Sequence, residues 1–271
     1  MPAQSSDLLV KTLSVLTPVH AHARAAEFLT DLYESVRAQH LPSGWNLQWV
    51  VQEDGAHPSL ADVVDQLVGK DPRVSYRAHR TQGGPAVARN QAFHASRGEV
   101  VFPIDHDDYL EPGGLSALIV ALEESPEIAW ATGRTYEIDE QLVRTKRSDF
   151  VEPGLVPAGH TLNLWNTQGV STPWYPTATA YRRWAVELFG GWPANVAAED
   201  TELLACITTA WDDIVATAYT MTRRLWSGQI TKDPVVINAA ADARQVRHNR
   251  ATLINAWRTG GLLGGPSAEC D

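Results

Sequence analysis

The most concentrated group of side chains that could do chemistry is the acidic stretch Asp105-His106-Asp107-Asp108, which follows an apolar run at 100–104. Asp105 and Asp107 are two positions apart, so on an extended backbone their side chains point the same way. Carboxylates this close repel one another unless a cation joins them, and an all-oxygen donor set favours Mg²⁺ or Mn²⁺. Mg²⁺ usually completes its shell with water and phosphate oxygens, which a nucleotide diphosphate would supply. The stretch predicts a metal site, with a solvated acidic turn before a helix near Pro112 as the alternative.

A second candidate is the run Gly83-Gly84-Pro85, followed by Arg89. Glycines before a helix leave backbone N–H groups free for an anion, and proline suits the first helical position. Arg89 lies one turn into this predicted helix, from where it could reach a phosphate or one of the aspartates. The alternative is an ordinary helix start with a surface arginine.

The pair Glu199-Asp200 opens another predicted helix. Acidic residues are favoured at a helix N-terminus by the helix dipole, so simple capping is one interpretation. The other is a general base, because a carboxylate aimed at a hydroxyl can take its proton as the oxygen attacks.

Histidine, cysteine and tryptophan residues give weaker signals. The nine histidines, among them His20 and His22, form no His-Glu-x-x-His motif and have no cysteine partner, so we predict no zinc site. The two cysteines, Cys206 and Cys270, cannot make a disulfide scaffold, and Cys206 is predicted to lie in the core. Four tryptophans are predicted to be core residues, with stacking on sugar rings as the alternative: Trp165, Trp174, Trp192 and Trp226.

Elements that could position these side chains alternate regularly over residues 13–132. Strands are predicted at 13–16, 47–51, 74–78, 99–104 and 128–132, with helices near 28–36, 60–68, 85–96 and 115–122 between them. Strands joined by short helical crossovers run parallel, and ligands bind at their carboxyl ends. We therefore expect Thr17-Pro18-Val19-His20, Glu53-Asp54-Gly55 and the acidic stretch to converge on one crevice.

The second half of the chain is less regular. Residues 151–177 show no clear period and predict a long loop or lid with some strand. Helices are expected at 182–189 and 199–211, a strand at 214–222 and a closing helix at 238–257, with a frayed Gly-rich tail.

Composition sets the class of protein. The 271 residues are 44% hydrophobic and 20% charged, which suits one α/β domain and excludes a disordered chain. A net charge of -10 argues against nucleic acid or an anionic membrane surface as partner. No apolar run approaches the roughly 20 residues that span a bilayer, and no signal-peptide pattern is present. We expect a cytoplasmic protein without stable membrane insertion.

The motifs, in their order and over residues 12–232, resemble the inverting glycosyltransferases of family 2 with the GT-A fold. The matching segments are Thr17-Pro18-Val19-His20-Ala21, Val51-Gln52-Glu53-Asp54-Gly55, Ala88-Arg89-Asn90, Asp105-His106-Asp107-Asp108, Gly190-Gly191-Trp192 and Glu199-Asp200. The resemblance implies one Rossmann-like α/β domain with a mostly parallel central sheet flanked by helices. Its nucleotide-sugar-binding half would span 1–110, its acceptor-binding and catalytic half 111–232, and a C-terminal helix and tail 233–271.

The resemblance also implies roles for single residues. Nucleotide binding falls to five of them, with the first three around the base and Asp105 near the ribose: Pro18, His20, Asp54, Arg89 and Asp105. Asp107 would hold the metal, with Asp105 and Asp108 as supporting carboxylates. Asp200 would be the catalytic base, and Glu199 would orient it or bind the acceptor.

Two positions depart from the family pattern. Glu53 stands where the family usually has aspartate. Trp226 stands where many members have a histidine that helps hold the metal or the diphosphate, so the third protein contact to the metal is missing from the sequence, with His248 or water as substitutes.

The predicted function is a metal-dependent inverting glycosyltransferase that uses Mn²⁺ or Mg²⁺ and a nucleotide-diphosphate sugar, UDP-sugar on family frequency. Its acceptor would be a small molecule or a saccharide, and the 151–177 segment would close over the donor. Three alternatives are a nucleotidyltransferase, which needs no base at Asp200, a phosphate-ester hydrolase, and a non-catalytic nucleotide or sugar binder. The donor sugar, the acceptor and the oligomeric state stay open.

Overall fold

The protein is described here by a computed structural model, which covers residues 10–148, 151–168, 173–195 and 197–261. The predicted frayed tail and Cys270 lie outside these residues, apart from Gly260 and Gly261. In chain order the elements are β1 (Lys11–Val19), α1 (Ala25–Arg37), β2 (Trp45–Asp54), α2 (Pro58–Lys70), β3 (Val74–His79), α3 (Pro85–Ala95), β4 (Val100–Pro103), β5 (Tyr109–Leu110), α4 (Gly114–Glu124), β6 (Trp130–Ile138), β7 (Arg144–Lys146), β8 (Gly154–Val156), α5 (His160–Gln168), η1 (Pro176–Ala178), β9 (Thr179–Arg182), α6 (Arg183–Leu188), α7 (Glu199–Ala210), β10 (Asp213–Arg224), η2 (Ile230–Lys232) and α8 (Pro234–Thr259).

One sheet joins the strands in the order β3-β2-β1-β4-β9-β6-β10-β5, with β7 beside β6 and β8 beside β10. Strands β1 to β4 pair in parallel, as the alternating pattern predicts, and β6 pairs in parallel with β10. The mostly parallel α/β fold is therefore confirmed. Between β4 and β6, however, the short strand β9 inserts antiparallel to both neighbours.

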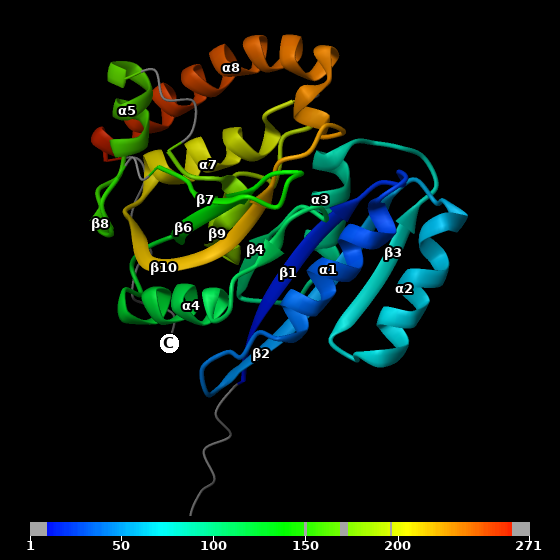
Figure 1. Cartoon of the computed structure of the whole chain (residues 1–271). Helices are drawn as coiled ribbons and strands as arrows, with labels where there is room; N and C mark the ends of the chain where they lie inside the picture. Colours follow the sequence, from blue (N-terminus) through cyan, green and yellow to red (C-terminus); the bar gives the residue numbers. More distant parts are fainter. Residues whose placement is uncertain (1–9, 149–150, 169–172, 196, 262–271) are drawn as a thin grey trace, which may run out of the picture.

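Helices cover both faces of the sheet (Figure 1). Helices α1, α2 and α4 pack on one face, where Phe28, Leu29, Leu32 and Val36 of α1 follow the helical period and are buried. Helices α3, α6 and α7 contribute to the core on the other face, and α8 lies along α7. The sheet is thus held between two helical layers, which leave the carboxyl ends of the parallel strands uncovered.

The prediction of a long loop or lid with some strand at 151–177 is confirmed for the strand but misses a helix. Its described residues form β8, helix α5 and the start of η1, and α5 packs on α7 and α8. Polar residues fill most of α5, and of residues 160–167 only Thr161, Leu162 and Leu164 are buried, so the helix shows almost no hydrophobic period. The closing helix α8 also begins four residues early, at Pro234, because the Asp233 side chain accepts a hydrogen bond from the Val235 N–H.

Most of the tryptophans and Cys206 lie as predicted. Trp174, Trp192 and Cys206 are buried in the core, and Trp165 packs against Arg247 of α8. Trp226 is different, because it lies beside the carboxyl ends of the parallel strands. In the part of the chain that the structure describes, no helix has the length and apolarity needed to cross a bilayer.

Candidate active site

A pocket of about 410 Å³ opens at the carboxyl ends of the parallel strands. The pocket is lined by all nine residues that the sequence assigns to nucleotide binding, metal binding or catalysis, although they come from segments far apart in the chain: Pro18, His20, Asp54, Arg89, Asp105, Asp107, Asp108, Glu199 and Asp200. The predicted crevice therefore exists, and the carboxyl-end rule for parallel sheets located it.

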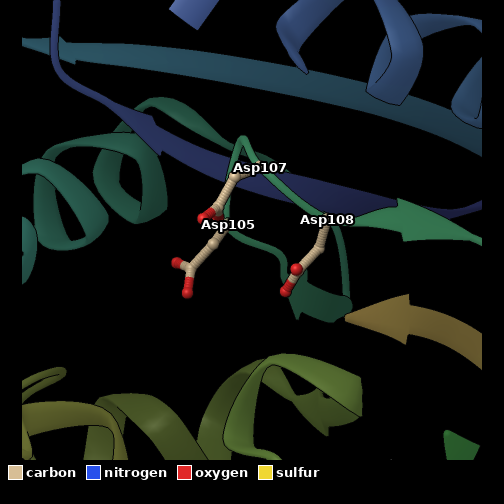
Figure 2. Close-up of side chains that lie close together, drawn as sticks. All are labelled: Asp105, Asp107 and Asp108. Carbon is tan, nitrogen blue, oxygen red and sulfur yellow. The ribbon is translucent and has the colours of Figure 1, made fainter. Parts of the chain in front are cut away.

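The acidic stretch forms the floor of this pocket. Asp105, Asp107 and Asp108 each place a carboxylate oxygen within 4.8 Å of the others, and the three side chains project to the same side of one turn (Figure 2). Burial raises the pKa of Asp107, and the charge of Asp105 raises it further. Burial, followed by the charges of Asp107 and Asp105, holds the pKa of Asp108 well above its usual range. Such a crowded oxygen set fits a hard divalent cation, which would relieve the repulsion.

The alternative of a solvated acidic cap is wrong for this turn. Helix α4 begins at Gly114 after Gly113, and no side chain caps it. Asp108 is only 3% exposed, and its Oδ1 accepts a hydrogen bond from the Arg224 N–H at 2.9 Å. The acidic turn is thus fixed to the end of β10 rather than to the helix that follows it.

Arg89 lies buried between two acidic motifs. Its Nη2 donates to Asp105 Oδ1 at 2.6 Å, and its Nη1 donates to Glu199 Oε1. Of the two roles that the sequence left open for Arg89, contact with an aspartate is the one observed. The guanidinium joins the acidic turn after β4 to the start of α7, so it sets the distance between the two carboxylate motifs.

Glu199 and Asp200 face different surroundings at the start of α7. Glu199 is 5% exposed and paired with Arg89, and burial raises its pKa to about 7 although the Arg89 charge opposes the shift. Asp200 is less buried, and one of its oxygens accepts hydrogen bonds from the N–H and hydroxyl of Thr201. Since Ala198, just before the helix, adopts a left-handed conformation with φ 62°, the chain turns sharply and presents both carboxylates to the pocket.

The Gly-Gly-Trp turn is held by the asparagine of the Ala-Arg-Asn motif. Asn90 donates to the Trp192 carbonyl at 2.7 Å and accepts from the Trp192 N–H at 2.9 Å. Gly191 has φ +82°, and a Cβ there would lie 2.2 Å from the Asn90 amide oxygen. Only glycine allows this close approach.

The glycines before α3 are engaged differently from the prediction. The N–H groups of Gly83 and Gly84 donate to the Asp54 carboxylate at 2.6 and 2.9 Å, so the anion at this helix start is the protein's own. Glu53, the departure from the family aspartate, is fully buried and accepts hydrogen bonds from Tyr76 and from the His57 N–H. It braces the loop after β2.

A histidine cluster beside the acidic turn was not foreseen. The rings of His20, His22 and His106 have centroids 5.0 to 5.4 Å apart. The Arg24 N–H donates to His22 Nδ1, which assigns the proton of His22 to Nε2, 2.7 Å from His106 Nε2. Burial lowers the pKa of His106 to about 3, so its ring is neutral. The cluster ties the acidic turn to the end of β1, and its sequence signals were the pair His20 and His22 and the histidine within Asp105–Asp108.

Sequence reasoning also missed the pocket wall formed after β10. Arg223 lines the pocket, with its guanidinium 4.6 Å from the Tyr175 ring centre. Residues 228–231 line it too, whereas no described residue of 151–177 does. His248, a proposed substitute metal ligand, is exposed on α8 and does not line the pocket. The end of β10 was the signal available, since it is another carboxyl end of a parallel strand.

The fold and the carboxylate geometry define a class, and comparison with known proteins specifies it. The sequence profile of Glycosyl transferase family 2 matches residues 14–189, and the chain belongs to this family. The O-antigen biosynthesis protein RfbC of Myxococcus xanthus is 30% identical over 43% of this chain and 9% of its own length. Glycosyltransferase GlyG of Streptococcus pneumoniae is 23% identical over 47% of this chain and 40% of its own length. The chain thus spans less than half the length of these relatives.

Solved structures show the same GT-A fold. Residues 1–349 of TarS from Staphylococcus aureus, in complex with UDP-GlcNAc, superpose with a TM-score of 0.68 at 17% identity, covering 92% of this chain and 71% of that one. The mannosyltransferase PcManGT from Pyrobaculum calidifontis, in complex with GDP-Man and Mn²⁺, gives a TM-score of 0.57 at 15% identity, covering 96% of this chain and 76% of that one.

Proposed function

We propose that this chain transfers a sugar, with inversion, from a nucleotide-diphosphate sugar to an acceptor hydroxyl, and that it needs Mn²⁺ or Mg²⁺. The observation that carries the proposal is that three clustered carboxylates and a separate carboxylate, Asp200, line one pocket at the strand ends. UDP-sugar is the donor that family frequency favours, and the complex of TarS with UDP-GlcNAc is consistent with it.

We assign nucleotide binding and acceptor binding to different parts of the chain. Residues up to 110 supply Pro18, His20 and Asp54 at the end of the pocket where the base and ribose would lie. Residues 111–232 supply Asp200 and Arg223 to the same pocket, where they would face the acceptor and the diphosphate. The C-terminal part adds Val236 of α8 to the wall. We therefore assign the nucleotide to the first half of the domain and the acceptor to the second.

In the proposed reaction Asp200 takes the proton of the acceptor hydroxyl while that oxygen attacks the anomeric carbon. The new glycosidic C–O bond forms as the bond to the diphosphate breaks, and the diphosphate leaves with the electron pair on the opposite face. Because the acceptor oxygen enters on the face opposite the departing diphosphate, the anomeric centre is inverted. Arg89 and Glu199 keep Asp200 at its distance from the acidic turn.

The acidic turn would hold the cation through Asp105, Asp107 and Asp108. When bound, a divalent cation neutralises the negative charge that develops on the departing diphosphate. Arg223 adds a fixed positive charge at the same place, because it lines the pocket and its charge acts on Asp108 and Asp105.

Calorimetric titration of UDP, GDP and dTDP, each with Mn²⁺ and with EDTA, tests the donor site. We expect one diphosphate to bind in the presence of Mn²⁺, and Asp107→Ala to lose this metal-dependent binding. Asp62→Ala, at an exposed position of α2, is the control and should bind as the unaltered protein does. If none of the three diphosphates binds with Mn²⁺, the proposal fails and a non-catalytic binder becomes the better interpretation.

A further inference from the structure

Trp226 occupies a fixed position at the edge of the acidic turn. Its indole Nε1 donates a hydrogen bond to Asp107 Oδ2 at 2.7 Å. The ring stacks on His22, with centroids 5.1 Å apart and planes at 28°, and meets Phe28 edge-on at 5.1 Å. Contacts on two sides therefore hold the ring so that its N–H faces the carboxylate.

The same tryptophan anchors the pocket wall at 228–231. A Cβ on Gly228 would lie 2.2 Å from the Trp226 ring, so this glycine lets the segment pass directly over the indole. The Lys232 ammonium donates to the Trp226 backbone carbonyl at 2.6 Å, and the Trp226 backbone N–H donates to Gln229 Oε1 at 3.3 Å. One residue thus connects the pocket wall to the acidic turn.

An indole N–H can only donate a hydrogen bond, so Trp226 cannot be a metal ligand. What it can do is fix the rotation of the Asp107 carboxylate and occupy one of its two oxygens. Arg89 occupies one oxygen of Asp105 in the same way, and the Arg224 N–H occupies one of Asp108. Each carboxylate is thereby arranged to offer a single oxygen, which is how Mg²⁺ and Mn²⁺ are usually bound when phosphate and water complete the shell.

We propose that Trp226 is a positioning residue that orients Asp107 through its indole N–H and, because it cannot bind the cation itself, makes cation binding depend on the nucleotide diphosphate. This inference rests on the proposed metal-dependent function. Its consequence is a reciprocal coupling, in which Mn²⁺ and the diphosphate each tighten the binding of the other by the same factor.

The test measures Mn²⁺ binding rather than turnover. Free Mn²⁺ is followed by electron paramagnetic resonance in titrations of the unaltered protein, Trp226→Phe and Trp226→His, each with and without UDP. Trp226→Phe keeps the ring contacts and removes the donor, whereas Trp226→His supplies a nitrogen that can donate to Asp107 or bind the metal. Trp257→Phe, on the exposed side of α8, is the matched control.

For the unaltered protein we expect Mn²⁺ affinity to rise at least about tenfold when UDP is added. Trp226→Phe should bind Mn²⁺ about tenfold more weakly in the presence of UDP, the usual lower limit for losing a partner that orients a metal ligand. Trp226→His should restore that affinity and bind Mn²⁺ more tightly than the unaltered protein when UDP is absent. Trp257→Phe should behave as the unaltered protein in both conditions.

The outcomes separate the two proposals. If the unaltered protein binds no Mn²⁺ with UDP, nor with GDP or dTDP in its place, the metal-dependent function itself fails. If it binds Mn²⁺ and Trp226→Phe binds equally well, or if UDP leaves the Mn²⁺ affinity unchanged, the role of Trp226 is overturned while the function stands. Thermal melting reports whether each variant folds. If Trp226→Phe does not fold, Trp226→His still tests the inference. The inference is overturned if this variant binds Mn²⁺ without UDP no more tightly than the unaltered protein does.

Discussion

At the scale of single residues, the site separates two neighbouring carboxylates by their surroundings. Glu199 is buried and paired with Arg89, whereas Asp200 keeps access to the pocket and bonds only to the adjacent Thr201 among the hydrogen bonds of the described residues. Adjacent side chains on a helix point in different directions, so Glu199 can form a structural ion pair while Asp200 faces the pocket. This difference makes distinct predictions for the two residues.

Asp200→Asn should abolish most of the turnover without weakening donor binding. The amide keeps the size of the side chain and can still accept from Thr201, but it cannot take a proton, and general bases contribute about 10²–10⁴ in rate. Sugar transfer from the donor identified by calorimetry gives the rate, and the same titration gives its affinity. Asp62→Asn, the same change on the surface of α2, should leave both values unaltered. Near-normal turnover of Asp200→Asn would instead favour a nucleotidyltransferase.

Glu199 should make the stability of the protein depend on pH between about 4.5 and 7. Burial raises its pKa from the usual 4.5 to about 7, so in this range the folded state binds more protons than the unfolded state. The contribution of Glu199 is therefore fully present below pH 4.5 and is lost as the pH rises toward 7. The free energy of unfolding, measured by urea denaturation, should fall less steeply with rising pH for Glu199→Gln than for the unaltered protein. Identical pH slopes would contradict the raised pKa.

At the scale of elements, short turns with unusual backbone angles hold the two halves of the site together. Asn90 on α3 clamps the turn around Gly191, and Arg89, one residue earlier, reaches Asp105 and Glu199. Helix α3 thus fixes both the acidic turn and the segment that leads into α7. The motif Ala-Arg-Asn works as one connector because consecutive side chains leave the helix in different directions.

Gly191→Ala should destabilise the fold by about 2 kcal/mol more than Gly44→Ala. Both glycines have φ near +82°, so both substitutions carry the left-handed backbone penalty of about 1–2 kcal/mol. Only at position 191 would the new Cβ lie 2.2 Å from Asn90, whereas nothing lies within 4 Å at position 44, and overpacking costs roughly 1–3 kcal/mol more. Urea midpoints of the two variants give the comparison, and equal losses would show that the Asn90 clamp yields freely.

At the scale of the whole molecule, one continuous sheet carries a site assembled from both ends of the chain. The pocket wall combines residues 18–20, at the end of β1, with lining residues between 223 and 236. These segments come together because β1 and β10 end on the same side of the sheet. Helix α8 packs along α7, and its Arg250 pairs with the buried Glu202, two residues beyond the candidate base. Helix α8 therefore braces the start of α7, which carries the candidate base.

Much of this arrangement could be predicted from the sequence, because it rests on local patterns. The strand and helix periods of residues 13–132 and the polar residues at strand ends located the pocket, and the carboxyl-end rule brought its acidic residues together. The antiparallel strand β9 and the helix α5 could not be predicted in this way. Their few buried residues carry no period, so only packing against the rest of the domain selects their structure.

The sequence by itself determined which residues could do chemistry here: the acidic turn, the Glu199-Asp200 pair and the order of motifs that marks family 2. Only the tertiary structure decided what each of them contacts. Arg89 joins residues separated from it by 16 and 110 positions, and Trp226 meets Asp107 across 119. Composition and local period carry no information on such distant pairs, since the contact exists only once both segments have packed against the same sheet.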